Sequence, residues 1–278
     1  MITDWDDAYA NGDHIADANS YPGMWSEQAA AFRETLITAK RAELDVSYGA
    51  EDREKYDLFL PENAPKGLVV FVHGGYWKAF DKSVWSHLAN GPVAKGWAVC
   101  MPSYTLAPDA RLSKITQQIG AAIDHAATKI EGPIHLTGHS AGGHLVSRMI
   151  SNTSPLSPAT LARVKNTVSI SGLHDLRPLL KTAMNDVLGL DDQEALQESA
   201  ALLNPALPCS LTCWVGAEER PEFVRQNDLL ANIWTGLGAS TRAVHAPDKH
   251  HFNVIADLAE PESDLTACLL NPINPEDT

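Results

Sequence analysis

LTGHSAGGHL, residues 136–145, places Ser140 between glycines at a point where an apolar run gives way to a helical pattern. Gly138 to Gly142 fit the pattern G-x-S-x-G, in which a serine occupies a tight turn between a strand and a helix and its hydroxyl points clear of the sheet. Glycines on both sides leave the backbone room for such a turn. A serine that opens a helix is often only a cap. A role for Ser140 as a nucleophile therefore requires a base, an acid and an oxyanion site elsewhere in the chain.

Short apolar runs alternate with amphipathic stretches on both sides of this motif. In residues 115–130, apolar side chains recur with a period of 3.6 residues, which is typical of a helix that faces the core. Alternation of strands with helices predicts an α/β fold, with a mainly parallel, eight-stranded sheet flanked by helices. The strands are expected at residues 43–48, 55–61, 67–75, 96–104, 133–138, 166–172, 210–216 and 241–247.

The length and composition fit one large domain. The 278 residues are 44% hydrophobic and 20% charged, which is ordinary for a globular protein. Residues 173–207 form a longer connection than a simple crossover and are expected to add a small helical cap over one end of the sheet. The polar residues 271–278 are expected to form a flexible tail. We therefore predict a single domain over residues 1–278.

The charge of the chain restricts its partners. A formal charge of −14 argues against binding to nucleic acid or to an anionic membrane surface. The apolar runs are too short to span a bilayer, and the acidic N-terminus lacks the pattern of a signal peptide. We expect a cytoplasmic protein that acts on a small molecule, and a homodimer is left open.

A loop that contains two glycines offers the oxyanion site. His73, Gly74 and Gly75 follow an apolar strand and resemble the HGGG-type loops of esterases. Glycines there let backbone N–H groups approach a developing oxyanion, and the amide after the nucleophile, that of Ala141, is a further donor. We assign Gly74, Gly75 and Ala141 to the oxyanion hole.

The base and the acid are expected in loops that follow two later strands. His250 and His251 come after the last strand, and because neighbouring side chains cannot both point at Ser140, one of them is a bystander. The order serine, acid, histidine is that of the α/β-hydrolases, in which a carboxylate orients the imidazole that takes the serine proton. The candidate acids are Glu218, Glu219 and Glu222 after the preceding strand, and Asp175 after the strand before that.

With these residues identified, the chain resembles the kynurenine formamidase (arylformamidase) branch of the α/β-hydrolases. The resemblance extends over residues 45–258. It departs from the family pattern at His174, where an aromatic side chain is usual, and at Glu219, where many members carry aspartate. The motifs that carry it are HGGYW at 73–77, GHSAGGHL at 138–145, SGLHDLRPLL at 171–180, ERPEF at 219–223 and HHF at 250–252.

The resemblance implies a role for each residue of the site. Ser140 is the nucleophile, His251 the base and Glu219 the acid, with Glu218 and Asp175 as alternative acids. The implied reaction is hydrolysis of the N-formyl group of an aryl amine such as N-formylkynurenine, through a formyl-enzyme that water cleaves. Packing under the loop is the alternative role for Tyr76 and Trp77. The residues expected to contact the substrate are His73, Tyr76, Trp77 and His139, with Trp25 as a further candidate at the mouth.

Other classes of protein fit these residues less well. His139 and His144 are five residues apart and so do not form the i, i+4 pair of HExxH metallopeptidases, and we expect neither a metal nor another cofactor. A binding protein that kept the fold and lost the chemistry is disfavoured because a serine and a histidine are both present. A short-chain carboxylesterase or a thioesterase would need the same residues, and both stay open as alternatives to the formamidase.

Overall fold

One eight-stranded sheet forms the centre of the computed structural model, which describes residues 2–273. The strands are β1 (Ala42–Ser47), β2 (Lys55–Phe59), β3 (Leu68–Val72), β4 (Ala98–Pro102), β5 (Ile134–His139), β6 (Val164–Ile170), β7 (Ser210–Gly216) and β8 (Ser240–Ala246). Their order in the sheet is β1-β2-β4-β3-β5-β6-β7-β8. β2 runs antiparallel to both of its neighbours, and all the remaining pairs of neighbouring strands are parallel. The predicted α/β-hydrolase fold is thereby confirmed.

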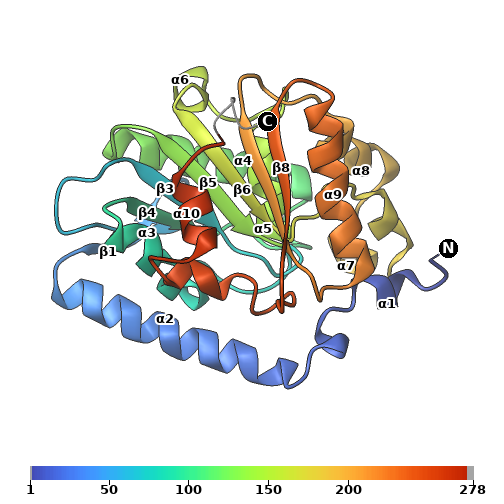
Figure 1. Ribbon diagram of the computed structural model, residues 1–278, viewed down its shortest axis with the longest axis horizontal. Helices are drawn as coiled ribbons and strands as arrows, with labels where there is room; N and C mark the ends of the chain where they lie inside the picture. The colour runs from blue at the N-terminus through green and yellow to red at the C-terminus, as the bar shows by residue number, and fades with distance from the viewer. Residues whose placement is uncertain (1, 274–278) are drawn as a thin grey trace.

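Helices cover both faces of this sheet (Figure 1). One face packs against α4 (Leu112–Lys129), α5 (Ala141–Met149), α8 (Asp192–Glu198) and α9 (Pro221–Thr235), and the other against α2 (Tyr21–Thr38), α3 (Asn90–Ala94) and α10 (Asp264–Leu270). The remaining α-helices of the described residues are α1 (Trp5–Tyr9), α6 (Pro158–Leu161) and α7 (Asn185–Leu188).

Strand β3 shows how the apolar runs produce these two cores. Leu68, Val70 and Val72 belong to the core beneath α4 and α5, whereas Val69 and Phe71 belong to the core on the opposite face. Successive side chains of a strand point to opposite faces, so a central strand covered on both sides must be apolar throughout. The apolar run thus marks β3 as a central strand. The loop that follows β3 therefore lies near the middle of the row of loops at the end of the sheet.

Residues 173–207 contain α7, α8 and the 3-10 helices Arg177–Lys181 and Ala200–Leu202. A buried ion pair joins this segment to α5, because Arg148 Nε lies 3.0 Å from Glu198 Oε2. Arg111, directly before α4, donates to Glu194 of α8. These contacts attach the segment to two helices of the main body. Of the predicted C-terminal tail, residues 274–278 lie outside the described residues.

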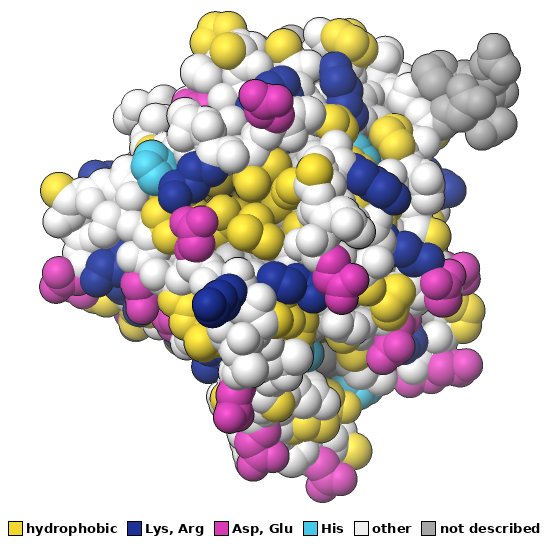
Figure 2. All heavy atoms as spheres, turned by 90° about the vertical axis from the view of Figure 1, so that its left-hand side faces the viewer, with side chains coloured by type: hydrophobic (Ala, Val, Ile, Leu, Met, Phe, Trp, Pro, Cys, Tyr) yellow, Lys and Arg dark blue, Asp and Glu magenta, His cyan; other side chains and the backbone are white. Residues whose placement is uncertain are grey.

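The surface around the edge strand β1 is charged. Glu43 and Asp45 of this strand pair with Lys129 and Lys82, respectively. Figure 2 looks at this side of the molecule, where acidic and basic side chains surround a central hydrophobic area. Charged side chains on an edge strand disfavour pairing with the strand of another molecule. In residues 2–273, no helix is both long enough and apolar enough to cross a bilayer.

Buried histidines give a testable dependence of stability on pH. His135 of β5 is 2% exposed and stacks against Trp97, and burial lowers its pKa from 6.5 to about 4. Between pH 6.5 and pH 4, the unfolded chain binds a proton on His135 that the folded chain does not bind. Protonation therefore favours the unfolded chain, and the free energy of unfolding falls as the pH is lowered from 6.5 toward 4. We expect the free energy of unfolding to drop between pH 7 and pH 5. In His135→Leu that drop should be smaller by roughly 2 kcal/mol. Urea denaturation at the two pH values measures it, and an unchanged drop would contradict the assignment.

Candidate active site

Ser140 occupies a strained turn between β5 and α5. Its backbone has φ 55° and ψ −116°, a conformation that side chains other than glycine rarely adopt and that is concentrated at functional sites. The turn is enforced by close packing, because a Cβ atom on Gly142 would lie 1.9 Å from the carbonyl oxygen of Val72, and one on Gly138 would lie 2.4 Å from that of Gly142. The amide of Ser140 donates to the Ile170 carbonyl at 2.8 Å. Neighbouring strands thus determine where the Ser140 hydroxyl lies.

A buried carboxylate orients His251. The Nδ1–H group of His251 donates to Oε2 of Glu219 at 2.6 Å, and both side chains are almost inaccessible to solvent. The other oxygen of Glu219 accepts from the Ser171 hydroxyl at 2.5 Å and from the Gly216 amide at 2.9 Å. With Nδ1 engaged in this way, Nε2 of His251 is the nitrogen that can take a proton from a hydroxyl.

The other candidate acids lie in different surroundings. Glu218 is exposed at the surface. Asp175 accepts two hydrogen bonds from the guanidinium of Arg177, each 2.9 Å long. Glu222 receives the Tyr9 hydroxyl at 2.7 Å and pairs with Arg225. Among the carboxylates named from the sequence, Glu219 is the one that the structure brings to His251.

His250 points away from this pair. Its Nε2 atom lies 3.1 Å from the Tyr21 hydroxyl, and its Nδ1 atom accepts the amide of Phe252 at 3.2 Å. Partial burial lowers the pKa of His250. The structure thus separates two neighbouring histidines into one that contacts Glu219 and one that packs on α2.

Ser140 and His251 line the same cavity, which has a volume of about 420 Å³. Within residues 2–273, no hydrogen bond joins the Ser140 hydroxyl to the His251 imidazole. Such bonds are often long in an enzyme without substrate and shorten in the complex. The cavity walls include the aromatic side chains of Tyr9, Trp25, Tyr76, Phe80, Trp85 and Phe252.

The backbone on either side of Ser140 offers donors for a substrate oxygen. A Cβ atom on Gly74 would lie 3.1 Å from the Cβ of Ser140, so the loop after β3 passes directly against the nucleophile turn. Gly75 lines the cavity with φ 109°. Ala141 is the first residue of α5, where an amide has no partner within the helix. The backbone amides of Gly75 and Ala141 have no hydrogen-bond acceptor within residues 2–273.

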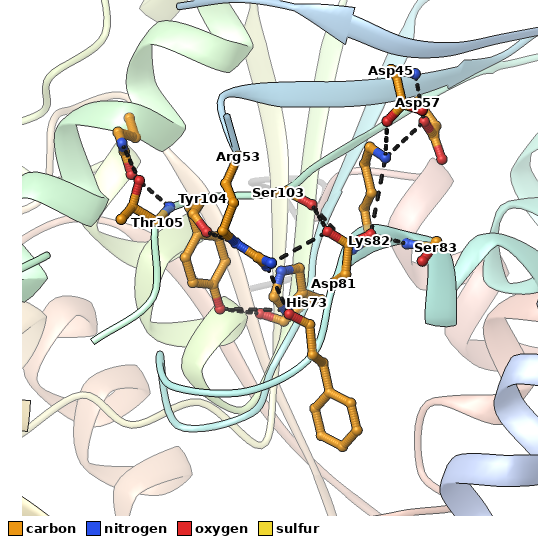
Figure 3. Close-up of polar contacts among 12 residues, drawn as sticks. Asp45, Arg53, Asp57, His73, Asp81, Lys82, Ser83, Ser103, Tyr104 and Thr105 are labelled. Atoms are coloured by element: carbon orange, nitrogen blue, oxygen red, sulfur yellow. Dashed lines mark hydrogen bonds and ion pairs between the residues drawn. The ribbon is translucent and has the colours of Figure 1, made fainter. Parts of the chain in front are cut away.

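A network of polar contacts stabilises the loop that follows β3 (Figure 3). The guanidinium of Arg53 donates to the carbonyl oxygens of Tyr104 and Phe80, both at 2.7 Å. Next along the loop, partial burial of Asp81 raises its pKa, but hydrogen bonds from Ser103 and Ser83 outweigh this effect and lower the pKa to about 2. The ionised Asp81 and the bonds of Arg53 together anchor residues 80 and 81 at the end of the loop.

His73 and Trp77 lie outside the cavity, although the sequence analysis assigns both to substrate binding. His73 stacks on Tyr104 with ring centroids 4.4 Å apart and donates to the Gly74 carbonyl at 2.8 Å (Figure 3). Burial lowers the pKa of His73 to about 4, so its ring is neutral. Trp77 is fully buried and donates to His144 at 3.2 Å. Both side chains support the loop from the core, which for Trp77 is the alternative role considered above.

Tyr76 and His139 do line the cavity. The Tyr76 hydroxyl donates to the Tyr9 carbonyl at 2.6 Å, which links the loop after β3 to the N-terminal segment. His139 donates from Nε2 to the His251 carbonyl at 2.9 Å. Burial, with a smaller effect of His251, holds the pKa of His139 well below its usual value. A neutral ring therefore packs beside the base.

Sequence reasoning missed several residues of the cavity wall. The short segment around α1 carries no chemical motif, so nothing along the chain indicates that it folds over Ser140. Phe252 follows His251 directly, and its position could have been used as a signal. The missed residues are Asp6, Tyr9, Ala10, Asn11, Gly12, Pro22, Lys78, Ala79, Phe80, Trp85, Met184 and Phe252. In residues 2–273, no group of three His, Cys, Asp or Glu side chains is arranged to hold a metal ion.

The fold together with this site defines an α/β-hydrolase. The family model described as BD-FAE matches residues 56–212. A kynurenine formamidase from Salmo salar is 30% identical over 256 residues, which cover 88% of this chain and 84% of the relative. A kynurenine formamidase from Danio rerio is 29% identical and covers similar shares, 89% and 85%. The chain belongs to the BD-FAE family, in the branch that contains the kynurenine formamidases, and is a hydrolase.

Solved structures agree with this placement. A protein from Silicibacter sp. TM1040, provisionally described as a thioesterase, is 52% identical with a TM-score of 0.92, and the match covers 96% of this chain and 99% of that one. A truncated carbohydrate esterase from gut microbiota is 16% identical with a TM-score of 0.64, over 81% of this chain and 95% of its own. The second likeness concerns the fold alone.

Replacement of the nucleophile provides the first test of the site. We expect Ser140→Ala to lower kcat by at least about a thousandfold, because no other group can form the acyl-enzyme. Circular dichroism and the unfolding temperature should stay close to those of the unmodified protein, since alanine adds no atoms to the packed turn. Substantial turnover by the purified, folded variant would contradict the assignment of Ser140.

Neighbouring pairs of residues provide matched tests of the base and the acid. Glu219→Gln removes the charge that stabilises a protonated His251, and we expect it to lower kcat by at least about a hundredfold. Glu218→Gln, one residue away at the surface, should change kcat less than about twofold. His251→Ala should likewise be far more damaging than His250→Ala. Equal losses within either pair would show that the wrong member was chosen.

Proposed function

We propose that this hydrolase removes a small acyl group from an aryl amine, and that its preferred substrates are N-formyl aryl amines such as N-formylkynurenine. The observation that carries the proposal is the cavity itself, in which Ser140 and His251, the latter bonded to Glu219, face a space whose walls include aromatic side chains. Aromatic walls suit a flat aryl leaving group, because they bury its faces at little conformational cost. The choice of formyl as the acyl group rests on the curated relatives, which are kynurenine formamidases.

The first half of the proposed reaction forms a formyl-enzyme. His251 takes the hydroxyl proton of Ser140 on Nε2 while the Ser140 oxygen bonds to the formyl carbon. The carbonyl oxygen becomes an oxyanion that accepts from the amides of Gly75 and Ala141, with the Gly74 backbone against the turn. The C–N bond then breaks, and the nitrogen leaves as an aryl amine after it receives the proton held by His251.

The second half of the reaction uses the same groups with water. His251 takes a proton from a water molecule, whose oxygen attacks the formyl carbon of the acylated Ser140. The tetrahedral intermediate collapses, the proton held by His251 returns to the Ser140 oxygen, and formic acid leaves and ionises to formate in solution. Glu219 stays ionised and stabilises the protonated imidazole in both halves. The enzyme is left as it began.

A thioesterase is the second candidate, favoured by the description of the Silicibacter protein at 52% identity. A thioester or an ester would react through the same acyl-enzyme, so the leaving group and the size of the acyl group separate the alternatives.

Three further properties stay predictions from the sequence. They are action on a small molecule rather than on nucleic acid or a membrane, a cytoplasmic location, and a possible homodimer.

A comparison of substrates tests the proposal. The value of kcat/KM is measured for N-formylkynurenine, p-nitrophenyl acetate, p-nitrophenyl butyrate and phenyl thioacetate with the same enzyme preparation. We expect N-formylkynurenine to exceed the others by about a hundredfold or more, even though amides are intrinsically less reactive than activated esters. A preference for butyrate would favour a carboxylesterase, and a preference for the thioester would favour a thioesterase. Ser140→Ala serves as the blank in each assay.

A further inference from the structure

Asn11 is a buried polar side chain in the cavity wall to which the proposed reaction assigns no role. It lies between α1 and the 3-10 helix Gly12–His14, it lines the cavity, and 4% of its surface is exposed. Both polar atoms of its carboxamide, Oδ1 and Nδ2, are buried and have no hydrogen-bond partner within residues 2–273. Unpaired buried amide groups are uncommon in folded proteins because they lose their bonds to water without replacement.

The local structure does not use this side chain. The backbone of Asn11 is satisfied, since its amide donates to the Tyr9 carbonyl and its carbonyl accepts from His14, both at 3.1 Å. Its side chain makes no capping bond to the following 3-10 helix, although asparagine commonly does so. The surrounding wall is apolar and includes Trp25 and Phe252. No structural task within the described residues therefore accounts for a carboxamide at this position.

The segment that carries Asn11 is tied to the catalytic loop. Tyr76, next to Gly75, donates its hydroxyl hydrogen to the carbonyl of Tyr9, two residues before Asn11. Tyr9 in turn donates from its own hydroxyl to Glu222 of α9 at 2.7 Å. These bonds hold residues 9–11 at a defined position relative to the oxyanion loop. Asn11 and Ser140 therefore line one cavity, and the bond from Tyr76 to Tyr9 fixes the segment of Asn11 relative to the loop beside Ser140.

We propose that Asn11 is a substrate-binding residue that recognises the N–H group of an aryl amide, an inference that rests on the proposed function. A carboxamide supplies one acceptor and two donors. In the proposed complex, Oδ1 accepts from the N–H group of the scissile amide, and Nδ2 donates to an acceptor on the aryl group. Bonding of the N–H hydrogen to Asn11 leaves the nitrogen lone pair directed toward the proton held by His251.

This arrangement selects amides over esters. An ester of the same shape has an oxygen in place of the N–H group, so Oδ1 would stay unpaired and would face the lone pairs of that oxygen. Sites that bond a substrate N–H group reject an analogue that lacks it, because the buried acceptor is then left without a partner. Asn11 would therefore account for preferential cleavage of a substrate that is chemically the less reactive of the two.

Two substrates that differ only at this atom test the inference. Formanilide and phenyl formate are compared, after subtraction of the uncatalysed rate, with the unmodified enzyme, with Asn11→Leu and with the control Asn232→Leu on the exposed side of α9. We expect Asn11→Leu to lower kcat/KM for formanilide about tenfold to a hundredfold and to leave that for phenyl formate unchanged or higher. The control should leave both unchanged. Equal losses for the two substrates, or no loss for formanilide, would overturn the inference.

A binding measurement separates failure of this inference from failure of the proposed function. If the unmodified enzyme cleaves phenyl formate but not formanilide, the proposed function is wrong. Asn11 is then tested by calorimetric titration of formanilide into Ser140→Ala, with and without Asn11→Leu. A Kd at least about tenfold weaker in the double variant supports recognition of the N–H group by Asn11, and an unchanged Kd overturns it. The unfolding temperature should not fall in Asn11→Leu, because the substitution removes an unpaired polar group from an apolar wall.

Discussion

The close approach of α5 to the end of β3 is the contact on which the site depends. Gly142 lies so near the Val72 carbonyl that any side chain there would overlap it, and a Cβ atom on Gly74 would lie 3.1 Å from the Cβ of Ser140. One packing contact thus positions the nucleophile turn and the oxyanion loop together. The strain at Ser140 persists because strands and helix on both sides hold the turn in place, not because the turn is locally stable. An active-site geometry that must be accurate to a fraction of an ångström is thereby attached to the most rigid part of the molecule.

The direction of the strands brings the other residues of the site together. β5, β6, β7 and β8 are mutually parallel, so the loops that follow them open at the same edge of the sheet. Ser140 follows β5, Ser171 follows β6, Glu219 follows β7 and His251 follows β8. The Ser171 hydroxyl and the Gly216 amide bond to one oxygen of Glu219 and leave the other for His251. Residues far apart in the chain are therefore brought into contact in the order in which their strands lie side by side.

Part of the cavity wall comes from the N-terminal segment of the chain. The matched family segment, residues 56–212, includes Ser140 and the loop after β3, whereas Asp6 to Trp25 fall outside it. These N-terminal residues fold back across the mouth and are linked to the loop by the bond between Tyr76 and Tyr9. Attack on a carbonyl requires the shared segment and the base. The N-terminal residues that line the cavity lie outside the matched family segment.

Local sequence patterns alone determined the strands, the main helices, the turn at Ser140 and the glycine loop at residues 73–75. Burial and tight turns act on neighbouring residues, so they leave a periodic or short-range signature that can be read along the chain. The tertiary structure decided which of Glu218 and Glu219 meets the imidazole, which of His250 and His251 turns inward, and that Trp77 packs in the core while Tyr76 faces the cavity. Those choices depend on partners more than thirty positions away in the chain, as for Glu219 and His251, which are 32 positions apart. The residues next to a side chain in the sequence do not indicate which distant segment will supply its partner.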